Sequence, residues 1–302
     1  MKNNLQNRIA VIGGTGFIGA SIYKNLKQVD SEIIYTSRHH LNICEDKDFI
    51  KFDLLNKHSW DNLLNGFKPN VVICTAWETE HDRYWDKGTN LEYMKYTLDF
   101  AASCLRGSVN KFIGFGSMAE YGFSPGKCNS KLTPFNPQNV YSESKLLTSI
   151  ALHRIAKDLG KKVNWVRLFQ VYGVNEKKER LIPQIVSNLV NRLPLTIKYP
   201  EHQLDFTYLN DISSAIRVIA MNDIDFSVNI GTGIATSVRN LCSTVSNLTG
   251  ANLSKFKFLE NSELKERVIY VDPDYDDFKG MWQAKYSLFD GLKETYKLLY
   301  KA

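Results

Sequence analysis

The sequence lacks the features that would place it in a membrane, secreted or zinc-binding class. No apolar run reaches the roughly 18 residues that a membrane-spanning helix needs, and the polar start MKNNLQNR has no secretory signal pattern. The five cysteines, Cys44, Cys74, Cys104, Cys128 and Cys242, show no CxxC spacing. An odd, scattered set argues against a disulfide framework and is typical of reduced thiols. We therefore expect a cytoplasmic protein with no membrane partner.

The charge distribution has no signature of nucleic-acid binding. The formal net charge is +6 at pH 7, but no dense Lys/Arg block with interleaved aromatic residues occurs. The excess therefore suits an anionic substrate or cofactor instead. The histidines have no metal-ligand spacing, and His39-His40 indicates a solvated loop. The acidic run at 271–277 contains Asp, Pro and Tyr, which is more typical of a turn than of a metal site. We expect neither nucleic acid nor a metal.

The stretch IAVIGGTGFIG contains the most informative pattern. Residues 9–12 predict a strand buried on both faces, and a helical pattern runs on to about Leu26. Gly13, Gly16 and Gly19 stand between them. A strand that turns through glycines into a helix leaves unpaired N–H groups pointing outward, and the missing Cβ atoms let a pyrophosphate approach. Such turns also occur for tight packing alone, but the strand and helix around this one predict dinucleotide binding.

The end of the second predicted strand, 32–36, favours NADP over NAD. NAD-type folds place an acidic residue here, which binds the ribose hydroxyls and repels a 2′-phosphate. This chain has Ser37-Arg38 instead, and a guanidinium offers a planar fork of donors to phosphate oxygens. A solvent-facing loop arginine is the alternative, and with it NAD stays open.

Two further strands are predicted to end beside this cofactor. The segment 49–54 ends near Asp53, whose carboxylate can accept a hydrogen bond from adenine or simply cap the segment that follows. The apolar run 71–74 is followed by Thr75-Ala76-Trp77. Small residues there let the backbone pass close to the cofactor, and Trp77 can lean over the sugar pocket.

A serine, a tyrosine and a lysine supply the predicted chemistry. Ser117 follows a predicted strand at 111–115, and a helical pattern over 140–159 places Tyr141 and Lys145 on one face. A nearby ammonium lowers the pKa of a tyrosine from about 10. The phenol can then exchange a proton with the substrate oxygen that Ser117 binds, while a nicotinamide exchanges hydride with the same carbon. Tyr-x-x-x-Lys alone is common on helices, but the glycine turn and Ser117 make it a predicted catalytic trio.

Together these motifs resemble the extended short-chain dehydrogenase/reductase superfamily, in its NAD(P)-dependent sugar-nucleotide epimerase/dehydratase branch. The resemblance covers nearly the whole chain, and several motifs in the right order are more specific than one. They are GGTGFIG (13–19), Asp53-Leu54, GSMAEYG (116–122), YSESK (141–145), VRLFQVYG (166–173), HQLDFTYLND (202–211) and NIGTG (229–233).

The resemblance implies an α/β fold, a Rossmann-like doubly wound parallel sheet with a smaller C-terminal substrate-binding lobe. It also implies a nucleotide-linked sugar as substrate and a homodimer that forms through a four-helix bundle from helices near 90–106 and 140–159. The expected NAD(P)-binding domain is 1–173 plus about 205–232, and the expected lobe is about 174–204 and 233–302.

The chain departs from the family pattern directly after Ser117. Family 4,6-dehydratases carry an Asp-Glu pair there, which expels water from the sugar. Here Met118 and Ala119 can move no protons, and Glu120 comes one place too late and is expected to point elsewhere. Dehydratase activity is therefore not expected.

Two further departures affect the expected diphosphate site. The family often has Asn where Gln170 stands and Arg where Leu204 stands. We nominate Arg180 and Arg267 as the basic residues in their place, with exposed loop arginines as the alternative for each.

The sequence therefore predicts an NADPH-dependent sugar-nucleotide oxidoreductase that reduces C4 of a nucleotide-linked 4-keto-6-deoxy sugar in surface-polysaccharide precursor synthesis. A C4 epimerase or C4 dehydrogenase with tightly bound NAD would use the same three residues and stays open. A non-catalytic NADP-sensing relative also stays open, although such proteins usually lose the tyrosine or the lysine.

The expected site residues fall into three groups. The catalytic group is Ser117, Tyr141 and Lys145. The cofactor-binding group is Gly13, Thr15, Gly16, Phe17, Ile18, Gly19, Ser37, Arg38, Asp53, Leu54, Thr75, Ala76, Trp77, Asn90, Tyr141 and Lys145. The substrate-binding group is Trp77, Ser117, Met118, Ala119, Gln170, Arg180 and Arg267.

Overall fold

A computed structural model describes residues 7–38, 47–78, 85–260, 265–273 and 278–300. The predictions for Cys44, for His39-His40 and for much of the acidic run at 271–277 concern residues outside this description. The other four cysteines are buried free thiols. No helix in the described ranges is long and apolar enough to cross a membrane. The chain forms two compact units, Met1–Glu120 with Pro137–Arg167 and Ser213–Val228, and Tyr121–Asn136 with Leu168–Ile212 and Asn229–Ala302.

The first unit is built on a seven-stranded sheet with the order β11-β7-β5-β4-β1-β2-β3. The neighbouring strands from β5 to β3 are parallel. Strand order reverses at β1, the place where open α/β sheets bind ligands. This confirms the predicted α/β class and Rossmann-like sheet. The strands are β1 (Arg8–Ile12), β2 (Glu32–Ser37), β3 (Phe49–Lys51), β4 (Val71–Cys74), β5 (Lys111–Ser117), β7 (Lys162–Leu168) and β11 (Val228–Ile230), of which only Val228 is counted in this unit.

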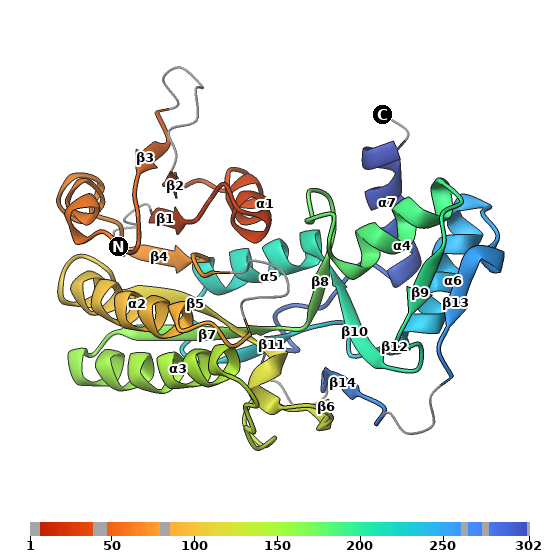
Figure 1. The fold of residues 1–302 in the computed structure, drawn as a ribbon. Coiled ribbons are helices and arrows are strands. Elements are labelled where there is room, and N and C mark those ends of the chain that lie inside the picture. The colour runs from red at the N-terminus through yellow and green to blue at the C-terminus, as the bar shows by residue number, and fades with distance from the viewer. Residues whose placement is uncertain (1–6, 39–46, 79–84, 261–264, 274–277, 301–302) are drawn as a thin grey trace. The chain divides into compact units, whose positions relative to one another are not determined.

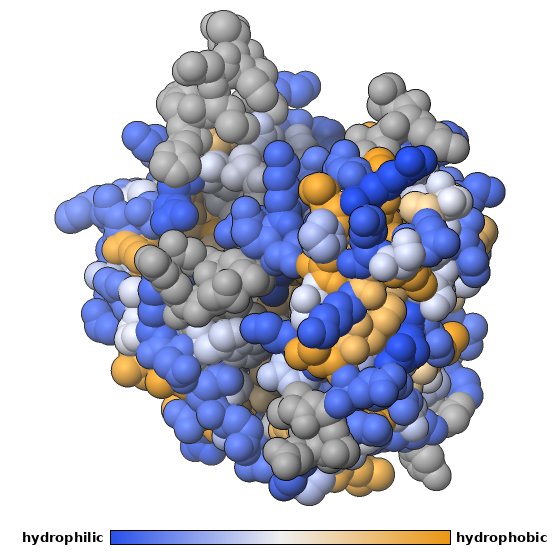
Figure 2. Space-filling view, turned by 45° about the vertical axis from the view of Figure 1, so that its right-hand side comes forward, coloured by the Kyte–Doolittle hydropathy of each residue, from blue (hydrophilic) through white to orange (hydrophobic). Residues whose placement is uncertain are grey.

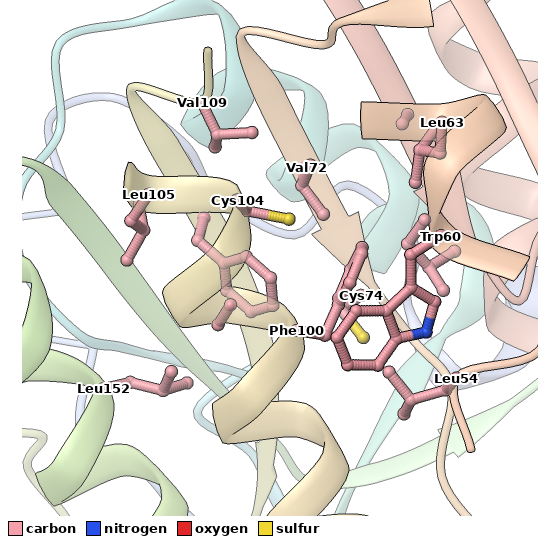
Figure 3. Close-up of a cluster of buried hydrophobic side chains, with 14 of the residues drawn as sticks. Leu54, Trp60, Leu63, Val72, Cys74, Phe100, Cys104, Leu105, Val109 and Leu152 are labelled. Carbon is pink, nitrogen blue, oxygen red and sulfur yellow. The ribbon is translucent and has the colours of Figure 1, made fainter. Parts of the chain in front are cut away.

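Both faces of this sheet are covered. Successive side chains of a strand point to opposite faces, and Ile9 and Ala10 on β1 are both fully buried. On one face, Phe100 and Cys104 of α2 and Leu152 of α3 join an apolar cluster with side chains of the sheet (Figure 3). The helical elements of this unit are α1 (Phe17–Leu26), η1 (Lys57–Trp60), η2 (Asn62–Phe67), α2 (Thr89–Arg106), α3 (Val140–Leu159) and α5 (Leu209–Met221), which enters the unit at Ser213.

Helices α2 and α3 pack side by side (Figure 1). The bounds of α3 agree with the prediction, and its start is set by a capping box between Asn139 and Ser142. The helix ends at Gly160, which adopts the left-handed conformation that glycine tolerates best. This helix carries Tyr141 and Lys145 in its first turns.

The second unit contains two smaller sheets. One has the order β12-β10-β14-β6 with β8 paired to β10, and the other pairs β13 with β9. The expected NAD(P)-binding domain included residues 121–136, 168–173, 205–212 and 229–232, and all four segments belong to this compact unit. One reason is that β6 and β10 pair within its sheet. The short helix η3 (Met118–Tyr121) ends at the first residue of this unit. The other elements are β6 (Gly126–Cys128), β8 (Gln170–Tyr172), α4 (Leu181–Val190), β9 (Leu195–Ile197), β10 (Gln203–Tyr208), β12 (Ala235–Ser237), α6 (Val238–Thr249), η4 (Leu253–Lys255), β13 (Phe256–Phe258), β14 (Val268–Val271) and α7 (Leu288–Tyr300).

A buried carboxylate joins two of the sequence motifs inside the second unit. Asp205 of β10 accepts hydrogen bonds from the backbone N–H groups of Thr232, Gly233 and Val271 at 2.8–3.2 Å. Its side chain is fully buried. The motifs HQLDFTYLND and NIGTG therefore have a structural role, because a buried side chain of the first holds the backbone of the second. On the face shown in Figure 2, hydrophilic side chains predominate and apolar ones gather in a few areas.

Candidate active site

The glycine turn allows β1 and α1 to approach one another closely. Gly13 has a φ of +77°, and a Cβ there would lie 2.8 Å from Oγ1 of Thr75. A Cβ on Gly19 would lie only 2.2 Å from the carbonyl oxygen of Gly13. Real Cβ contacts are never this short, so glycine is required at both positions for packing. The packing explanation from the sequence therefore holds at these two positions, and it is compatible with ligand binding.

The start of α1 is open in a way that suits a phosphate. Its N-cap residue is Gly16, which offers no side-chain cap, and the first turn contains no acidic residue. The helical bonding starts at the N–H of Ala20, which donates to Gly16 O at 2.9 Å. The N–H groups of Phe17 and Ile18 precede it and have no helical acceptor. The dipole and these donors would hold the pyrophosphate of a dinucleotide.

The two residues at the end of β2 have different surroundings. Ser37 is buried, and its hydroxyl accepts a hydrogen bond from that of Thr15 at 3.1 Å. Arg38 is exposed. Because Ser37 is buried and Arg38 is exposed, Arg38 is the one of these two residues whose side chain is accessible to a phosphate. Burial raises the pKa of Tyr93, and the charge of Arg38 lowers that pKa less strongly.

The turn after β3 uses its carboxylate locally. The strand ends at Lys51, before the predicted end, since Leu54 turns into the core. Asp53 Oδ1 accepts a hydrogen bond from the N–H of Leu55 at 3.1 Å. The alternative role predicted for Asp53, as a cap of the segment that follows, is therefore present, and the side chain of Leu54 is buried.

The end of β4 holds a tryptophan in a fixed orientation. The Trp77 indole N–H donates to Oδ1 of Asn90 at 2.9 Å, and Asn90 is fully buried at the start of α2. The Asn90 amide in turn donates to Lys87 O at 3.0 Å. Asn90, expected to touch the cofactor, thus has a structural partner in Trp77.

The end of β5 fixes both the backbone and the hydroxyl of Ser117. Its N–H donates to Oε1 of Glu120 at 2.9 Å, and its Oγ accepts from the N–H of Ala119 at 3.2 Å. With the oxygen engaged as an acceptor, the hydroxyl proton is available for a substrate oxygen. Met118 and Ala119 are both buried.

Glu120 forms an internal ion pair. Its side chain is fully buried, and Oε2 lies 2.7 Å from Nε of the buried Arg167 on β7. The indole N–H of Trp165, also on β7, donates to Oε1 at 3.1 Å. The carboxylate is thus tied into the protein interior and is not offered to a substrate, as expected from its position in the sequence.

The lysine of the predicted trio reaches the same strand end. Nζ of Lys145 donates to the carbonyl of Phe115 on β5 at 2.8 Å. It lies 3.7 Å from the ring centroid of Trp77 and 5.8 Å from that of Tyr141. The backbone N–H of Tyr141 donates to Trp85 O at 2.9 Å, and the two rings meet edge to face. The fold therefore brings α3, β4 and β5 together around this ammonium.

Burial lowers the pKa of Lys145 from 10.5 to about 7, and the charge of Glu120 opposes this shift. Between these values the unfolded chain binds a proton that the folded protein does not. The free energy of unfolding contributed by this group therefore rises with pH across the window.

Lys145→Met removes this titration. We expect its free energy of unfolding, relative to that of wild type, to be highest below about pH 7 and to fall steadily up to about pH 10. Denaturant unfolding of both proteins at several pH values measures the difference. Lys24→Met, at an exposed position of α1, is the control and should show no such trend. A Lys145→Met difference that is constant with pH would contradict the buried environment.

The remaining predicted substrate residues lie in the second unit. Gln170 begins β8, and Arg180 is the N-cap residue of α4. Nε of Arg267 donates to Phe123 O at 2.9 Å. This unit also contains a cavity of about 430 Å³ lined in part by Tyr199 and His202, which the sequence analysis did not identify. Within the described ranges, no group of three or more His, Cys, Asp or Glu side chains could hold a metal ion.

Two curated proteins illustrate what the chain resembles. It is 23% identical over 312 residues to a trifunctional UDP-glucose 4,6-dehydratase, UDP-4-keto-6-deoxy-D-glucose 3,5-epimerase and UDP-4-keto-L-rhamnose reductase of Arabidopsis thaliana. That match covers 95% of this chain and 46% of the Arabidopsis protein, so the chain spans about half its length. It is 26% identical over 270 residues to UDP-glucose 4-epimerase of Mycoplasma genitalium, covering 77% and 78% of the two chains.

The fold is also similar to solved structures. UDP-glucose 4-epimerase of Thermus thermophilus, in complex with NAD, superposes with a TM-score of 0.77 at 20% identity, over 95% of this chain and 97% of the other. A family model described as the NAD dependent epimerase/dehydratase family matches residues 9–231. Because that match covers well over half of the sequence, the protein belongs to the NAD dependent epimerase/dehydratase family, a group of enzymes of the extended short-chain dehydrogenase/reductase type.

Proposed function

We propose that this enzyme reduces C4 of a nucleotide-linked 4-keto-6-deoxy sugar with NADPH, in the synthesis of surface-polysaccharide precursors. The observation that carries the proposal is the environment after Ser117. Met118 and Ala119 are buried and have no titratable group, and the Glu120 carboxylate is held by Arg167. A carbonyl can thus be reduced beside Ser117, but residues 118–120 supply no acid and base to eliminate water.

The proposed mechanism assigns one task to each residue of the trio. The bound dinucleotide supplies the hydride. Ser117 donates its hydroxyl proton in a hydrogen bond to the C4 carbonyl oxygen, because Oγ itself already accepts from Ala119. Tyr141 gives that oxygen its proton as hydride reaches the carbon. Lys145, fixed on Phe115 O and against Trp77, places positive charge near the phenol in its protonated form, and this charge stabilises the phenolate that remains.

The proposed cofactor is NADP, and two features at the ends of β1 and β2 support it. The uncapped start of α1 fits the pyrophosphate, and the exposed Arg38 fits a 2′-phosphate. The described end of β2 has no carboxylate to repel that phosphate. On the other side, the Thermus relative was solved with NAD, which favours the alternative below.

The alternative is a C4 epimerase or C4 dehydrogenase that keeps NAD tightly bound. The name of the Mycoplasma relative favours it, and the same trio would serve, since oxidation at C4 is the reverse of the proposed step. The difference lies in whether the dinucleotide is consumed.

Identifying the nucleotide that copurifies with the protein separates the two functions. NADPH is then added with UDP-linked or dTDP-linked 4-keto-6-deoxyglucose, and its absorbance is followed. The reductase should lose one NADPH for each keto sugar. Tightly held NAD(H) with no NADPH turnover would reject the reductase in favour of the alternative. Cofactor binding without any hydride transfer would favour a non-catalytic sensor.

We also propose that two copies associate through α2 and α3. Leu91 on α2 and Leu147 and Ile150 on α3 are each more than half exposed, although these helices pack side by side in the first unit. Pairing with the same two helices of a second copy would bury these side chains in a four-helix bundle.

Replacing Leu147 and Ile150 together by glutamate should convert a dimer into a monomer, because like charges would meet across the two-fold axis. Sedimentation velocity measures the change. Leu132→Glu, at another exposed leucine, should leave the dimer intact. A wild type that sediments as a monomer, or a double variant that still dimerises, would contradict the bundle.

A further inference from the structure

The hydrogen bonds of Glu120 indicate a role beyond neutralising the charge of Arg167. Its two carboxylate oxygens have different partners. Oε2 is 2.7 Å from Nε of Arg167, whereas Oε1 accepts from the Ser117 N–H at 2.9 Å and from the Trp165 indole at 3.1 Å. Both oxygens are therefore held by side chains of β7, and Oε1 also holds the end of β5.

The neighbouring glycine makes room for this arrangement. A Cβ on Gly116 would lie 2.2 Å from Glu120 Oε1, 2.3 Å from Nε1 of Trp165 and 3.0 Å from Cγ of Arg167. Only glycine thus lets the carboxylate reach the N–H of Ser117. Because the side chains of Glu120, Trp165 and Arg167 are buried, water does not compete for their hydrogen bonds.

The network also reaches the Ser117 hydroxyl. The chain from Ser117 to Glu120 folds back so that the Ala119 N–H donates to Ser117 Oγ at 3.2 Å while the Ser117 N–H meets Glu120. Release of the carboxylate would free the backbone that sets the position of Oγ.

We propose that Glu120 is a positioning residue, whose carboxylate, anchored by Arg167 and Trp165, holds the backbone of Ser117 so that its hydroxyl meets the substrate oxygen. This inference rests on the proposed role of Ser117. In this role Glu120 accepts a hydrogen bond from the Ser117 N–H and transfers no proton.

Two double variants isolate that task. Removing one partner of a buried ion pair leaves the other charge uncompensated, so both variants replace Arg167 as well. Glu120→Gln/Arg167→Met keeps an acceptor for the Ser117 N–H, and Glu120→Leu/Arg167→Met does not. With NADPH and dTDP-linked or UDP-linked 4-keto-6-deoxyglucose, we expect kcat of the leucine variant to be about tenfold or more below that of the glutamine variant, because small misplacements near the reacting atoms are costly. Dissociation constants for the dinucleotide should agree within about twofold, since the network does not touch the α1 turn.

The same pair in a Ser117→Ala background tests whether Glu120 acts through Ser117. The difference between the two variants should then disappear. Equal kcat values in the presence of Ser117, or an unchanged ratio in its absence, would overturn the inference. A Ser117→Ala enzyme with wild-type kcat would instead reject the proposed role of Ser117, and a wild type that oxidises no NADPH with these sugars would reject the proposed function.

Hydrogen exchange at the Ser117 amide gives a readout that needs no substrate. The amide should stay protected in the glutamine variant and exchange at least about tenfold faster in the leucine variant. Equal protection would overturn the inference. If the leucine variant does not fold, Glu120→Asp takes its place, because its carboxylate is one methylene further from the Ser117 N–H and should give the same loss of protection.

Discussion

Tyr141→Phe should lower kcat by about 10²- to 10⁴-fold, the range that general acid catalysis contributes. The phenol proton is needed only as the substrate oxygen gains charge. Two contacts of this residue, its backbone bond to Trp85 and the packing of the two rings, do not involve the hydroxyl and survive its loss. The dissociation constant of the dinucleotide should therefore stay within about twofold.

The measurement is single-turnover NADPH oxidation together with a titration of the dinucleotide. Tyr96→Phe on α2, which makes the same chemical change elsewhere in the first unit, is the control and should retain full activity. A Tyr141→Phe enzyme with more than about a tenth of the wild-type rate would mean that another group supplies the proton.

Arg38→Ala should weaken NADP binding by roughly ten- to a hundredfold, the equivalent of about 1.5–3 kcal/mol for a lost charge-assisted hydrogen bond. NAD binding should hardly change, because it has no 2′-phosphate to lose. Ser37→Asp should go further and invert the preference through repulsion. The structure supports this second change, since the Thr15 hydroxyl that now donates to Ser37 can donate to the new carboxylate.

Paired dissociation constants for NAD and NADP check both variants. Lys24→Ala, which changes the net charge equally at the other end of α1, should leave the ratio unaltered. If Arg38→Ala lost the same affinity for both cofactors, Arg38 would stack on the adenine that NAD and NADP share. A wild type that prefers NAD would refute the NADP assignment and favour the tightly bound NAD alternative.

The first unit could be predicted well because its elements are long or strongly apolar. The 71–74 strand and the 140–159 helix have the bounds that the sequence indicates. The third strand is shorter than predicted. Its apolar pattern runs on through Phe52 and Leu54, but these residues are buried in the core cluster after the strand has ended.

Most strands of the second unit were not predicted. Five of them, including β8 and β12, are only three residues long, too short for a period of two to be visible. Their partners are also distant in sequence, as in the pairing of β6 with β14. Such pairings depend on tertiary contacts and leave little local signal.

Within the candidate site, the sequence indicated the residue types but not how they are held. The Glu120–Arg167 pair connects positions 47 residues apart, and each charge alone looks like an ordinary surface residue. The contact between Trp77 and the Lys145 ammonium is equally invisible in a linear pattern. A buried charge can be recognised only once its partner is known.

Transfer of deuterium to the sugar, from NADPH that carries deuterium at both positions of the nicotinamide C4, tests the central claim most directly. A 4-keto-6-deoxy sugar linked to UDP or dTDP is incubated with the labelled cofactor, and the product is examined by mass spectrometry and NMR. A C4 reductase that works through Ser117, Tyr141 and Lys145 should place one deuterium on C4 for each NADPH oxidised. Unlabelled sugar and no net oxidation of NADPH would contradict the account.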